Sequence, residues 1–338
     1  MQKITRLPLP IYFESYAAVG GYEEEKGPLG HLFDLTDKTD LFGMKTWERA
    51  EGEMSRMALN IALKKASVAP IGVDIIVAGD LQNQCVASYE GLFSFGIPFI
   101  GLYGACSTAT ESLIVLSSML TSAKNYTRGA AVTSSHNCAA ERQFRTPLEY
   151  GAQRFESAQW TATAAGAFVL GKERGSAAIT SFMPGRVIDS YGTDATNMGA
   201  SMALAAFDTL SRFFDEENAD DFDLILTGDL GAVGTDILCD MLKDRLGECG
   251  RRIASVHRDA GLILYDSNRS DVHSGGSGCG CSASVLAADI LPRIEAGELS
   301  RVALISTGAL MSPSSVFQGE HILGVAPIAV IEHVENKN

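Results

Sequence analysis

The sequence lacks three features that would assign it to common classes of protein. It has no run of 18 apolar residues, so no segment is long enough to cross a bilayer as a helix. It has no Cys-x-x-Cys pair and no Cys/His spacing that suits a tetrahedral zinc site. Basic residues are scarce, because 27 Lys and Arg face 41 Asp and Glu and leave a net charge of −14. A surface of this sign is repelled by nucleic acid and by anionic lipid, so nucleic-acid binding through a basic face is excluded.

We also expect no export signal at the N-terminus, since Pro8 and Pro10 interrupt the stretch that would have to be apolar. We therefore expect the seven cysteines to be reduced thiols and not a disulfide framework. What is present is a chain of 338 residues, 46% hydrophobic, which is enough to bury a large core.

The chain contains two similar halves. Residues 73–81 (VDIIVAGDL) and 222–230 (FDLILTGDL) are short apolar runs that end in Gly-Asp-Leu, a pattern typical of buried strands. A second matched pair follows in each half, because residues 104–108 (GACST) and 278–282 (GCGCS) each lead through a helical pattern to another strand. Two matched pairs in the same order predict an α/β fold of two pseudo-symmetric halves. We place these halves at residues 1–185, which carry Cys106, and 186–338.

Cys106 is the first candidate for a functional side chain. It follows Gly104 and Ala105 after a predicted strand at residues 98–103, and an apolar helical pattern begins at once. This position would place the sulfur near unpaired backbone N–H groups and the positive end of the helix dipole, which favour the thiolate. The alternative is a small buried cysteine that packs at the corner between strand and helix.

A strand, Ala-Cys, small residues and a long apolar helix in a duplicated chain resemble the thiolase and ketoacyl-synthase superfamily. The resemblance implies a thiolase-like fold with α-β-α-β-α layers, and it makes Cys106 the counterpart of the acyl-accepting nucleophile. The chain departs from the superfamily elsewhere. Gly-Asp-Leu-Gly at residues 228–231 replaces the His-x-x-Asn turn of the condensing enzymes, and the glycine-rich residues 275–281 replace their Gly-Asn-Thr-Ser turn. Without those side chains, carbanion chemistry loses its base and its oxyanion donors, which argues against ordinary condensation.

A narrower resemblance extends over most of the chain. The blocks that carry it are similar to the stage V sporulation protein AD (SpoVAD) family: GPLGHLFD (27–34), AGDLQNQ (78–84), TSSHN (133–137), AERQFR (140–145), LILTGDL (224–230), GGSGCGCS (275–282) and TGALMSP (307–313). The resemblance implies a thiolase-like protein without established condensing activity. It also implies a role in moving dipicolinic acid, with calcium, into the developing spore, and direct binding of dipicolinate.

Dipicolinate is a flat pyridine with two carboxylates, so its site should offer cations or amide donors at both ends of an apolar slot. The densest group of such side chains follows the predicted strand at residues 130–134, at a strand end where α/β proteins bind ligands: His136, Asn137, Arg142, Gln143 and Arg145. Arg142 and Arg145 could each clamp one carboxylate, and His136 could donate to a carboxylate or to Cys106. The alternatives are a surface loop in which Glu141 pairs with an arginine, and an Arg145 that holds an interface.

The turn after the first repeated strand supplies Asp80 and Asn83 as further ligand-binding candidates. Asp80 could instead cap the helix that follows, which is the commoner role for Asp after a strand and Gly. Asp229 occupies the matched turn of the second half. Six or so oxygens would be needed to hold calcium, and no such cluster is visible. We therefore predict no metal site in the protein and expect calcium to arrive already chelated by the ligand.

Residues 275–282 form an unusual segment in which six of eight residues are Gly or Cys. Backbone N–H groups of Gly278, Cys279 and Cys281 could form an anion-binding nest at a helix start. The small residues could equally serve a close-packed crossing of two pseudo-symmetric helices. We include the three residues among the ligand-binding candidates and leave the two interpretations open.

The leading hypothesis is a non-catalytic binding protein for dipicolinic acid or calcium dipicolinate, without a cofactor of its own, needed for uptake into the spore. The alternative is an acyltransferase in which Cys106 forms a thioester and His136 is the base. We expect a homodimer that binds membrane proteins of the spore dipicolinate transport system. Those partners would hold it at the cytoplasmic face of the spore or forespore inner membrane, and otherwise it would be soluble in the cytoplasm.

Overall fold

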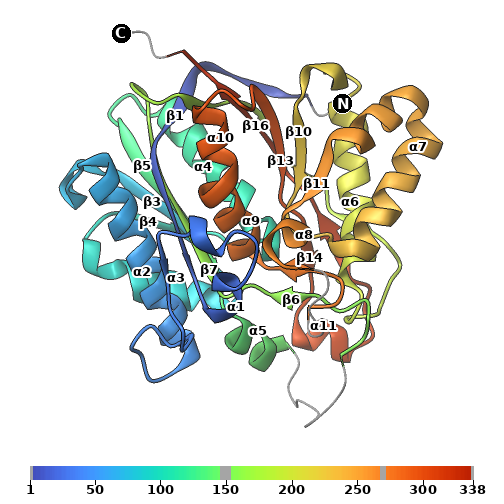
Figure 1. Cartoon of the computed structure of the whole chain (residues 1–338), viewed down its shortest axis with the longest axis horizontal. Coiled ribbons are helices and arrows are strands. Elements are labelled where there is room, and N and C mark those ends of the chain that lie inside the picture. The colour runs from blue at the N-terminus through green and yellow to red at the C-terminus, as the bar shows by residue number, and fades with distance from the viewer. Residues whose placement is uncertain (1–2, 145–153, 267–271, 336–338) are drawn as a thin grey trace.

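The central feature of the fold is a large mixed β-sheet, seen in a computed structural model that describes residues 3–144, 154–266 and 272–335. Its strand order is β11-β10-β13-β16-β8-β1-β7-β5-β3-β4, with the short β2 (Leu35–Thr36) beside β1. The sheet consists of two blocks of five strands with helices on their faces (Figure 1).

The two blocks repeat one topology. In the first block β1 (Thr5–Gly20) and β7 (Ala164–Gly171) are antiparallel, β7 pairs antiparallel with β5 (Arg128–Ser135), and β3 (Ile75–Gly79) lies parallel between β5 and β4 (Phe99–Gly101). The second block repeats this order with β8 (Ala177–Met183), β16 (Ile328–His333), β13 (Arg301–Ile305), β10 (Leu224–Thr227) and β11 (His257–Asp259). The strands that sequence comparison matched, β3 with β10 and β5 with β13, hold equivalent places.

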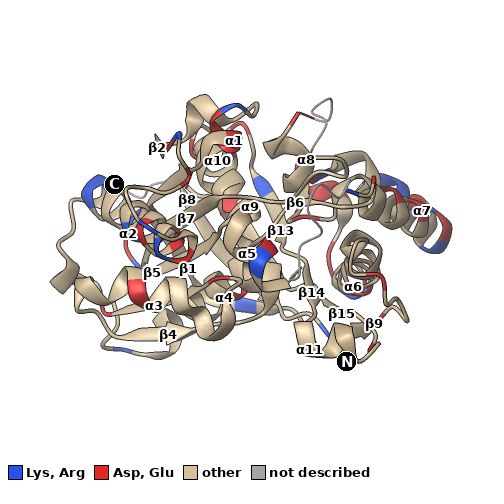
Figure 2. Cartoon of the chain, turned by 90° about the horizontal axis from the view of Figure 1, so that it is seen from below, with Lys and Arg blue, Asp and Glu red and all other residues tan. Residues whose placement is uncertain are grey.

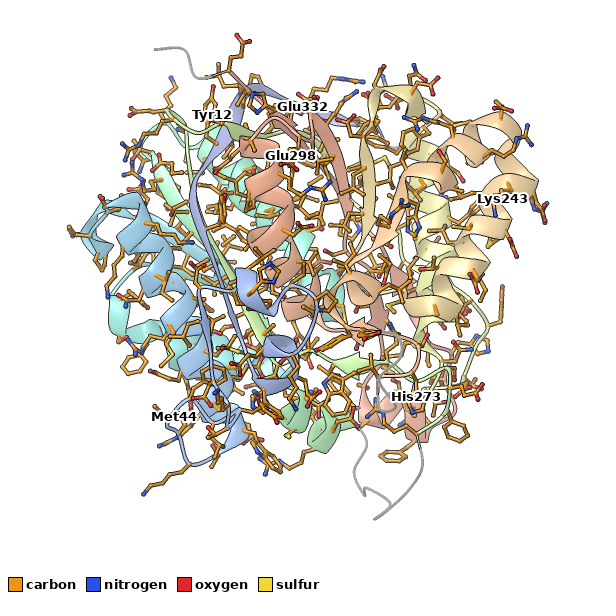
Figure 3. All side chains as sticks on the ribbon, in the orientation of Figure 1. Tyr12, Met44, Lys243, His273, Glu298 and Glu332 are labelled. Atoms are coloured by element: carbon orange, nitrogen blue, oxygen red, sulfur yellow. The ribbon has the colours of Figure 1, made fainter. Side chains whose placement is uncertain are left out.

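The blocks are joined by β1 and β8. Thr5 of β1 pairs with Phe182, and Ile11 pairs with Ile179 further along the same two strands. Tyr12 of β1 and Glu332 of β16 lie on opposite sides of Ala178 in β8, at the upper edge of the view in Figure 3. The division at residues 185 and 186 stays a prediction.

Helices cover the sheet blocks in three layers. The helices α2 (Trp47–Ala66) and α3 (Val86–Leu92) lie on the outer face of the first block, and α6 (Met198–Phe213) and α7 (Gly231–Val256) on the outer face of the second. Between the blocks lie α4 (Thr108–Ser122) and α9 (Cys279–Val285), which continues through a π-helical turn (Leu286–Ile290) into α10 (Leu291–Glu295). The predicted thiolase-like α-β-α-β-α layering is confirmed (Figure 1).

The remaining elements are short and gather mainly around one end of the layers. They are α1 (Tyr22–Glu25), α5 (Asn137–Phe144), β6 (Trp160–Thr161), β9 (Ile188–Asp189), α8 (Ala260–Leu264), β12 (Gly276–Ser277), β14 (Gly308–Leu310), α11 (Pro313–Phe317) and β15 (Leu323–Val325). Figure 1 places α5, β6 and α11 near one another at the lower edge of the molecule. The carboxyl ends of β3, β5 and β10 lead into this region, which is where an α/β sheet binds its ligands.

Candidate functional site

A pocket of about 290 Å³ lies between α5 and α11 and reaches Cys106. Its volume falls at the lower end of the range for small-molecule sites, roughly 300 Å³ and above. Its walls are largely apolar, with Leu81, Phe144, Met198 and Met311 among them. The hydroxyl groups of Tyr103, Thr161, Ser277, Ser312 and Ser315 also line it, together with Glu141. Among the residues that the structure describes, no Lys or Arg lines this pocket.

Cys106 lies at the start of a helical segment, as the sequence predicts. It sits in a 3-10 turn, Ala105–Ser107, that leads directly into α4. Ala105 has φ = 52°, a left-handed conformation that costs energy for a residue with a Cβ and turns the chain sharply before the cysteine. The N–H of Gly104 donates to Oγ1 of Thr108 at 3.0 Å, which helps hold the turn.

The thiol of Cys106 faces a carboxyl group and not a histidine or another basic side chain. It lies beside the carboxyl group of Asp229, which follows β10 in the other half. Burial is the main cause that raises the pKa of Cys106 well above its ordinary value, and the nearby Asp229 and Cys279 raise it further. The raised pKa favours the second interpretation, a buried cysteine in its thiol form, over the thiolate. The dipole of a helix start contributes about 1 kcal/mol, which is less than the cost of burying a charge beside an acid.

Asp229 is the functional candidate that sequence reasoning missed. It is 1% exposed, and its carboxyl accepts from Oγ1 of Thr307 at 2.7 Å and from the N–H of Gly278 at 2.9 Å. Burial raises its pKa to about 7. The signal in the sequence was the repeated Gly-Asp-Leu, which marked Asp229 as the counterpart of Asp80 but gave no sign that it reaches Cys106.

Asp80 acts as a helix cap, one of the two roles expected for it. Its carboxyl is fully buried and accepts from the N–H of Gln82 and from both the N–H and the hydroxyl of Ser88 in the first turn of α3. The start of α7 is capped by Asp259 on β11, which accepts from the N–H groups of Leu230 and Gly231. Asp229 is thereby free to point at Cys106.

Residues 275–282 pack closely against the strands β5 and β7, and the N–H group of Gly278 already donates to a side chain of the protein. Gly278 has φ = 104° and donates to Asp229, so the anion in this nest is a side chain of the protein itself. A Cβ on Gly280 would lie 2.1 Å from the carbonyl oxygen of Ala164. Cys279 and Cys281 are fully buried, and the thiol of Cys279 donates to the carbonyl of Ser134. These features favour the packing interpretation for Cys279 and Cys281.

His136 is buried and contacts the loop that precedes α2. Its Nε2 lies 2.8 Å from the carbonyl oxygen of Asp40, and burial lowers its pKa. Its Nδ1 is buried without a hydrogen-bond partner among the described residues. Asn137 begins α5, and its side chain donates to the carbonyl of Thr161 at 3.3 Å. The described contacts of His136 do not include Cys106, so they give no support to His136 as the base.

Arg142 points away from the pocket. It forms an ion pair with Glu48, its guanidinium lies over the ring of Trp47, and 55% of its side chain is exposed. Figure 2 shows acidic and basic colouring side by side on α5. Arg145, the second predicted clamp, lies outside the described residues.

Asn83 and Gln143 connect α5 to the turn after β3. Oε1 of Gln143 accepts from the N–H of Asn83 at 2.9 Å, and its Nε2 donates to the carbonyl of Leu81. The hydroxyl of Tyr103 donates to Oδ1 of Asn83 at 3.2 Å. Asn83 therefore helps place two residues that line the pocket, Leu81 and Tyr103.

Arg154 is a second candidate that sequence reasoning missed, and it contacts α5 through Glu141. It pairs with Glu141 of the pocket wall at 3.4 Å, donates to the carbonyl of Gln159, and lies over the ring of Trp160. Its Nε is buried without a hydrogen-bond partner in the described part of the chain. No motif in the sequence marked this arginine, because its contact with Glu141 is made through tertiary packing.

The family described as stage V sporulation protein AD (SpoVAD) matches residues 2–332 of this chain. The chain is 42% identical to the stage V sporulation protein AD of Bacillus subtilis (strain 168) over 327 residues, which cover 96% of this chain and 94% of that protein. The chain belongs to the SpoVAD family. Membership gives it a role in sporulation and confirms the resemblance seen in the sequence blocks.

Solved structures show the wider fold. A single-residue variant of OleA from Xanthomonas campestris superposes with a TM-score of 0.59 at 12% identity, covering 97% of this chain and 99% of that one. AbyA1, a tetronic acid condensing enzyme, superposes with a TM-score of 0.58 at 16% identity, covering 95% and 99%. At such identities the likeness establishes the shared fold of this SpoVAD family member and nothing about its chemistry. Within the described residues, no helix has the length and apolarity needed to cross a membrane.

Proposed function

We propose that this chain is a non-catalytic binding protein for dipicolinic acid or its calcium complex, needed for the uptake of that ligand into the developing spore. The observation that carries the proposal is the pocket that reaches Cys106, where the thiol meets an acid instead of a base. A buried thiol with a raised pKa is a poor nucleophile at neutral pH, since the thiolate is the reactive form. The same pocket remains suitable for binding a small ligand.

The chemistry of the pocket favours a ligand of low net charge. Apolar walls and hydroxyl groups suit a flat pyridine ring, whereas Glu141 and the −14 charge of the chain oppose a free dianion. The one-to-one calcium complex of dipicolinate is neutral. Calcium would thus reach the site with the ligand, and the protein would need no cofactor of its own. Arg154, beside Glu141, is the described cation best placed to meet a carboxylate.

The acyltransferase alternative would have Cys106 form a thioester with His136 as its base. The hydrogen bond of His136 to Asp40 and the raised pKa of Cys106 both weigh against it. Incubation with acetyl- or acyl-thioesters, followed by intact-mass measurement, should leave Cys106 unmodified. A stable acyl adduct on Cys106 that is absent from Cys106→Ala would favour the enzyme.

Calorimetric titration with dipicolinate, with and without calcium, tests the binding proposal. We expect saturable binding that is tighter for the calcium complex. Arg154→Met should weaken binding about tenfold or more, because a charge-assisted pair is lost. Arg142→Met removes the same charge from a residue that faces Glu48, so we expect a smaller effect. Cys106→Ala should bind nearly as well as the wild type, and absence of binding to either form of the ligand would contradict the proposal.

We propose that two copies pair through the first block of the sheet. The strand β4 ends the described sheet, and a strand at an edge presents unpaired N–H and C=O groups. Three exposed aromatic residues lie in β4 or within six residues of it in the sequence. Phe93 is 79% exposed, Tyr103 50% and Phe99 38%. Sedimentation velocity should show a dimer, and Phe99→Asp should shift it towards monomer. Val187→Asp, which alters an exposed apolar residue elsewhere, is the control, and a monomeric wild type at micromolar concentration would contradict the pairing.

The proposed place of action is the cytoplasmic face of the spore or forespore inner membrane. The net charge of −14 opposes direct adhesion to anionic lipid, so membrane proteins of the dipicolinate transport system would hold the chain there.

A further inference from the structure

We infer that Asp229 is the specificity-determining residue of the pocket. Free dipicolinate binds only when the carboxyl group of Asp229 carries a proton, whereas the neutral calcium complex binds in either state. This inference rests on the proposed function. Capture of the free dianion would then take up a proton, and capture of the calcium complex would take up none.

The first step of the argument is the divergence of the two repeated turns. Asp80 and Asp229 hold equivalent places after β3 and β10, but only Asp80 caps the helix that follows its strand. In the second half Asp259, from the neighbouring strand β11, accepts the N–H groups at the start of α7. Asp229 thus does not cap the helix that follows its own strand, and its carboxyl is directed instead towards the N–H of Gly278 and towards Cys106.

The second step is the position of Asp229 directly behind the pocket wall. Its carboxyl accepts from the N–H of Gly278 and lies beside the thiol of Cys106, and both Cys106 and Ser277, the neighbour of Gly278, line the pocket. A ligand that contacts Cys106 or Ser277 would therefore lie close to this carboxyl. At such separations in a protein interior, two like charges oppose one another by on the order of a few kcal/mol.

The third step concerns the other groups that face Asp229. They are the thiols of Cys106, Cys279 and Cys281, the hydroxyl of Thr307, the N–H of Gly278 and the carboxyl of Asp259. These groups are neutral or acidic, and no described Lys, Arg or His is among them. A charge on Asp229 therefore has no cation to offset it, and the pocket would carry it as a net negative potential. Burial and Asp259 bring the pKa of Asp229 to about 7, within the range where both states are populated.

Calorimetry in two buffers of different ionisation enthalpy tests the inference. For free dipicolinate we expect the wild type to take up nearly one proton per ligand at pH 7.5, and its Kd to rise roughly tenfold between pH 6.5 and pH 8. For the calcium complex we expect no proton uptake and little change in Kd. Asp229→Asn keeps the shape of the residue and should bind the free ligand with a Kd that no longer depends on pH.

Two further variants keep the test sharp. Thr307→Val removes the hydrogen bond that stabilises the ionised Asp229, so the midpoint of the pH dependence should move to higher pH. Asp236→Asn removes the same charge from the exposed surface of α7 and should leave the pH dependence as in the wild type. Binding of the free ligand without proton uptake, or a pH dependence that persists in Asp229→Asn, would overturn the inference while leaving the binding proposal intact. Failure of the wild type to bind either form would overturn both.

Discussion

Gly280→Ala is expected to destabilise the fold severely. The new Cβ would lie 2.1 Å from the carbonyl oxygen of Ala164 on β7 and 2.8 Å from the N–H nitrogen of Ser135 on β5. Both neighbours are backbone atoms of central strands, so neither can turn aside as a flexible side chain would. We expect a loss of about 3 kcal/mol or more in the free energy of unfolding. Thermal unfolding should show a fall in Tm of roughly 5 °C or more.

The matched control for this substitution is Gly72→Ala. Its Cβ would meet only Cγ1 of Val68, at 3.2 Å, near the surface of the first half. We expect its Tm to stay within about 1 °C of the wild type, as for ordinary surface changes. If Gly280→Ala behaved like Gly72→Ala, the crossing of α9 with β5 and β7 would be looser than the structure shows. The packing interpretation of residues 275–282 would then be wrong.

The stability of the protein is expected to fall as the pH rises from 6.5 to 8.5. Burial raises the pKa of Glu24 to about 7, of Glu51 to about 8 and of Asp229 to about 7. A carboxyl whose pKa is higher in the folded state contributes stability that is complete below its unfolded pKa and is lost as the pH rises through the folded value. The described interior offers these acids no buried Lys or Arg to take up their charge. We expect the free energy of unfolding to fall by several kcal/mol over this window, measured in urea at each pH.

Glu51→Gln tests the origin of this pH dependence. The carboxyl of Glu51 accepts from Nε2 of Gln82 and from the hydroxyl of Ser134, and an amide can take its place once Gln82 turns its own amide over. The variant should be more stable than the wild type at both pH values, and the gain should be larger at pH 8.5 than at pH 6.5. The window above 6.5 also avoids His257 and His136, whose lowered pKa values destabilise the fold only below the ordinary histidine value. A wild type equally stable at both pH values would show that these acids are not held neutral.

The strands and the repeat of two similar halves could be predicted from the sequence, because each strand has a local apolar pattern and the pattern occurs twice. The apolar runs at β3 and β10 and the helical pattern at α4 can each be recognised from the local sequence. Pro292 does not end the helical run in which it lies. It lies at the start of α10, and the preceding turn widens to a π-helix to accommodate it.

The side chains of the site were harder to place because their contacts depend on tertiary packing. Arg142 was grouped with the ligand set by its nearness in sequence. On α5, however, Ala140, Glu141 and Phe144 line the pocket while Arg142 turns to Glu48. The reach of Asp229 to Cys106 depends on how the two halves face one another, which no spacing within one half reveals. The sequence left the state of the Cys106 thiol open for a related reason, because the cost of burial is absent from any argument based on a helix start alone.

The strand β1 also determines how a ligand can enter. Its first residues pair with β8 in the second block, and its later residues pair with β7 in the first. A hinge motion that separated the halves would have to break this shared strand, which lies across the top of both blocks in Figure 1. The two halves therefore behave as one rigid frame, unlike proteins that close two lobes around a ligand. We therefore expect a ligand to enter and leave the pocket with the pairing of β1 unchanged.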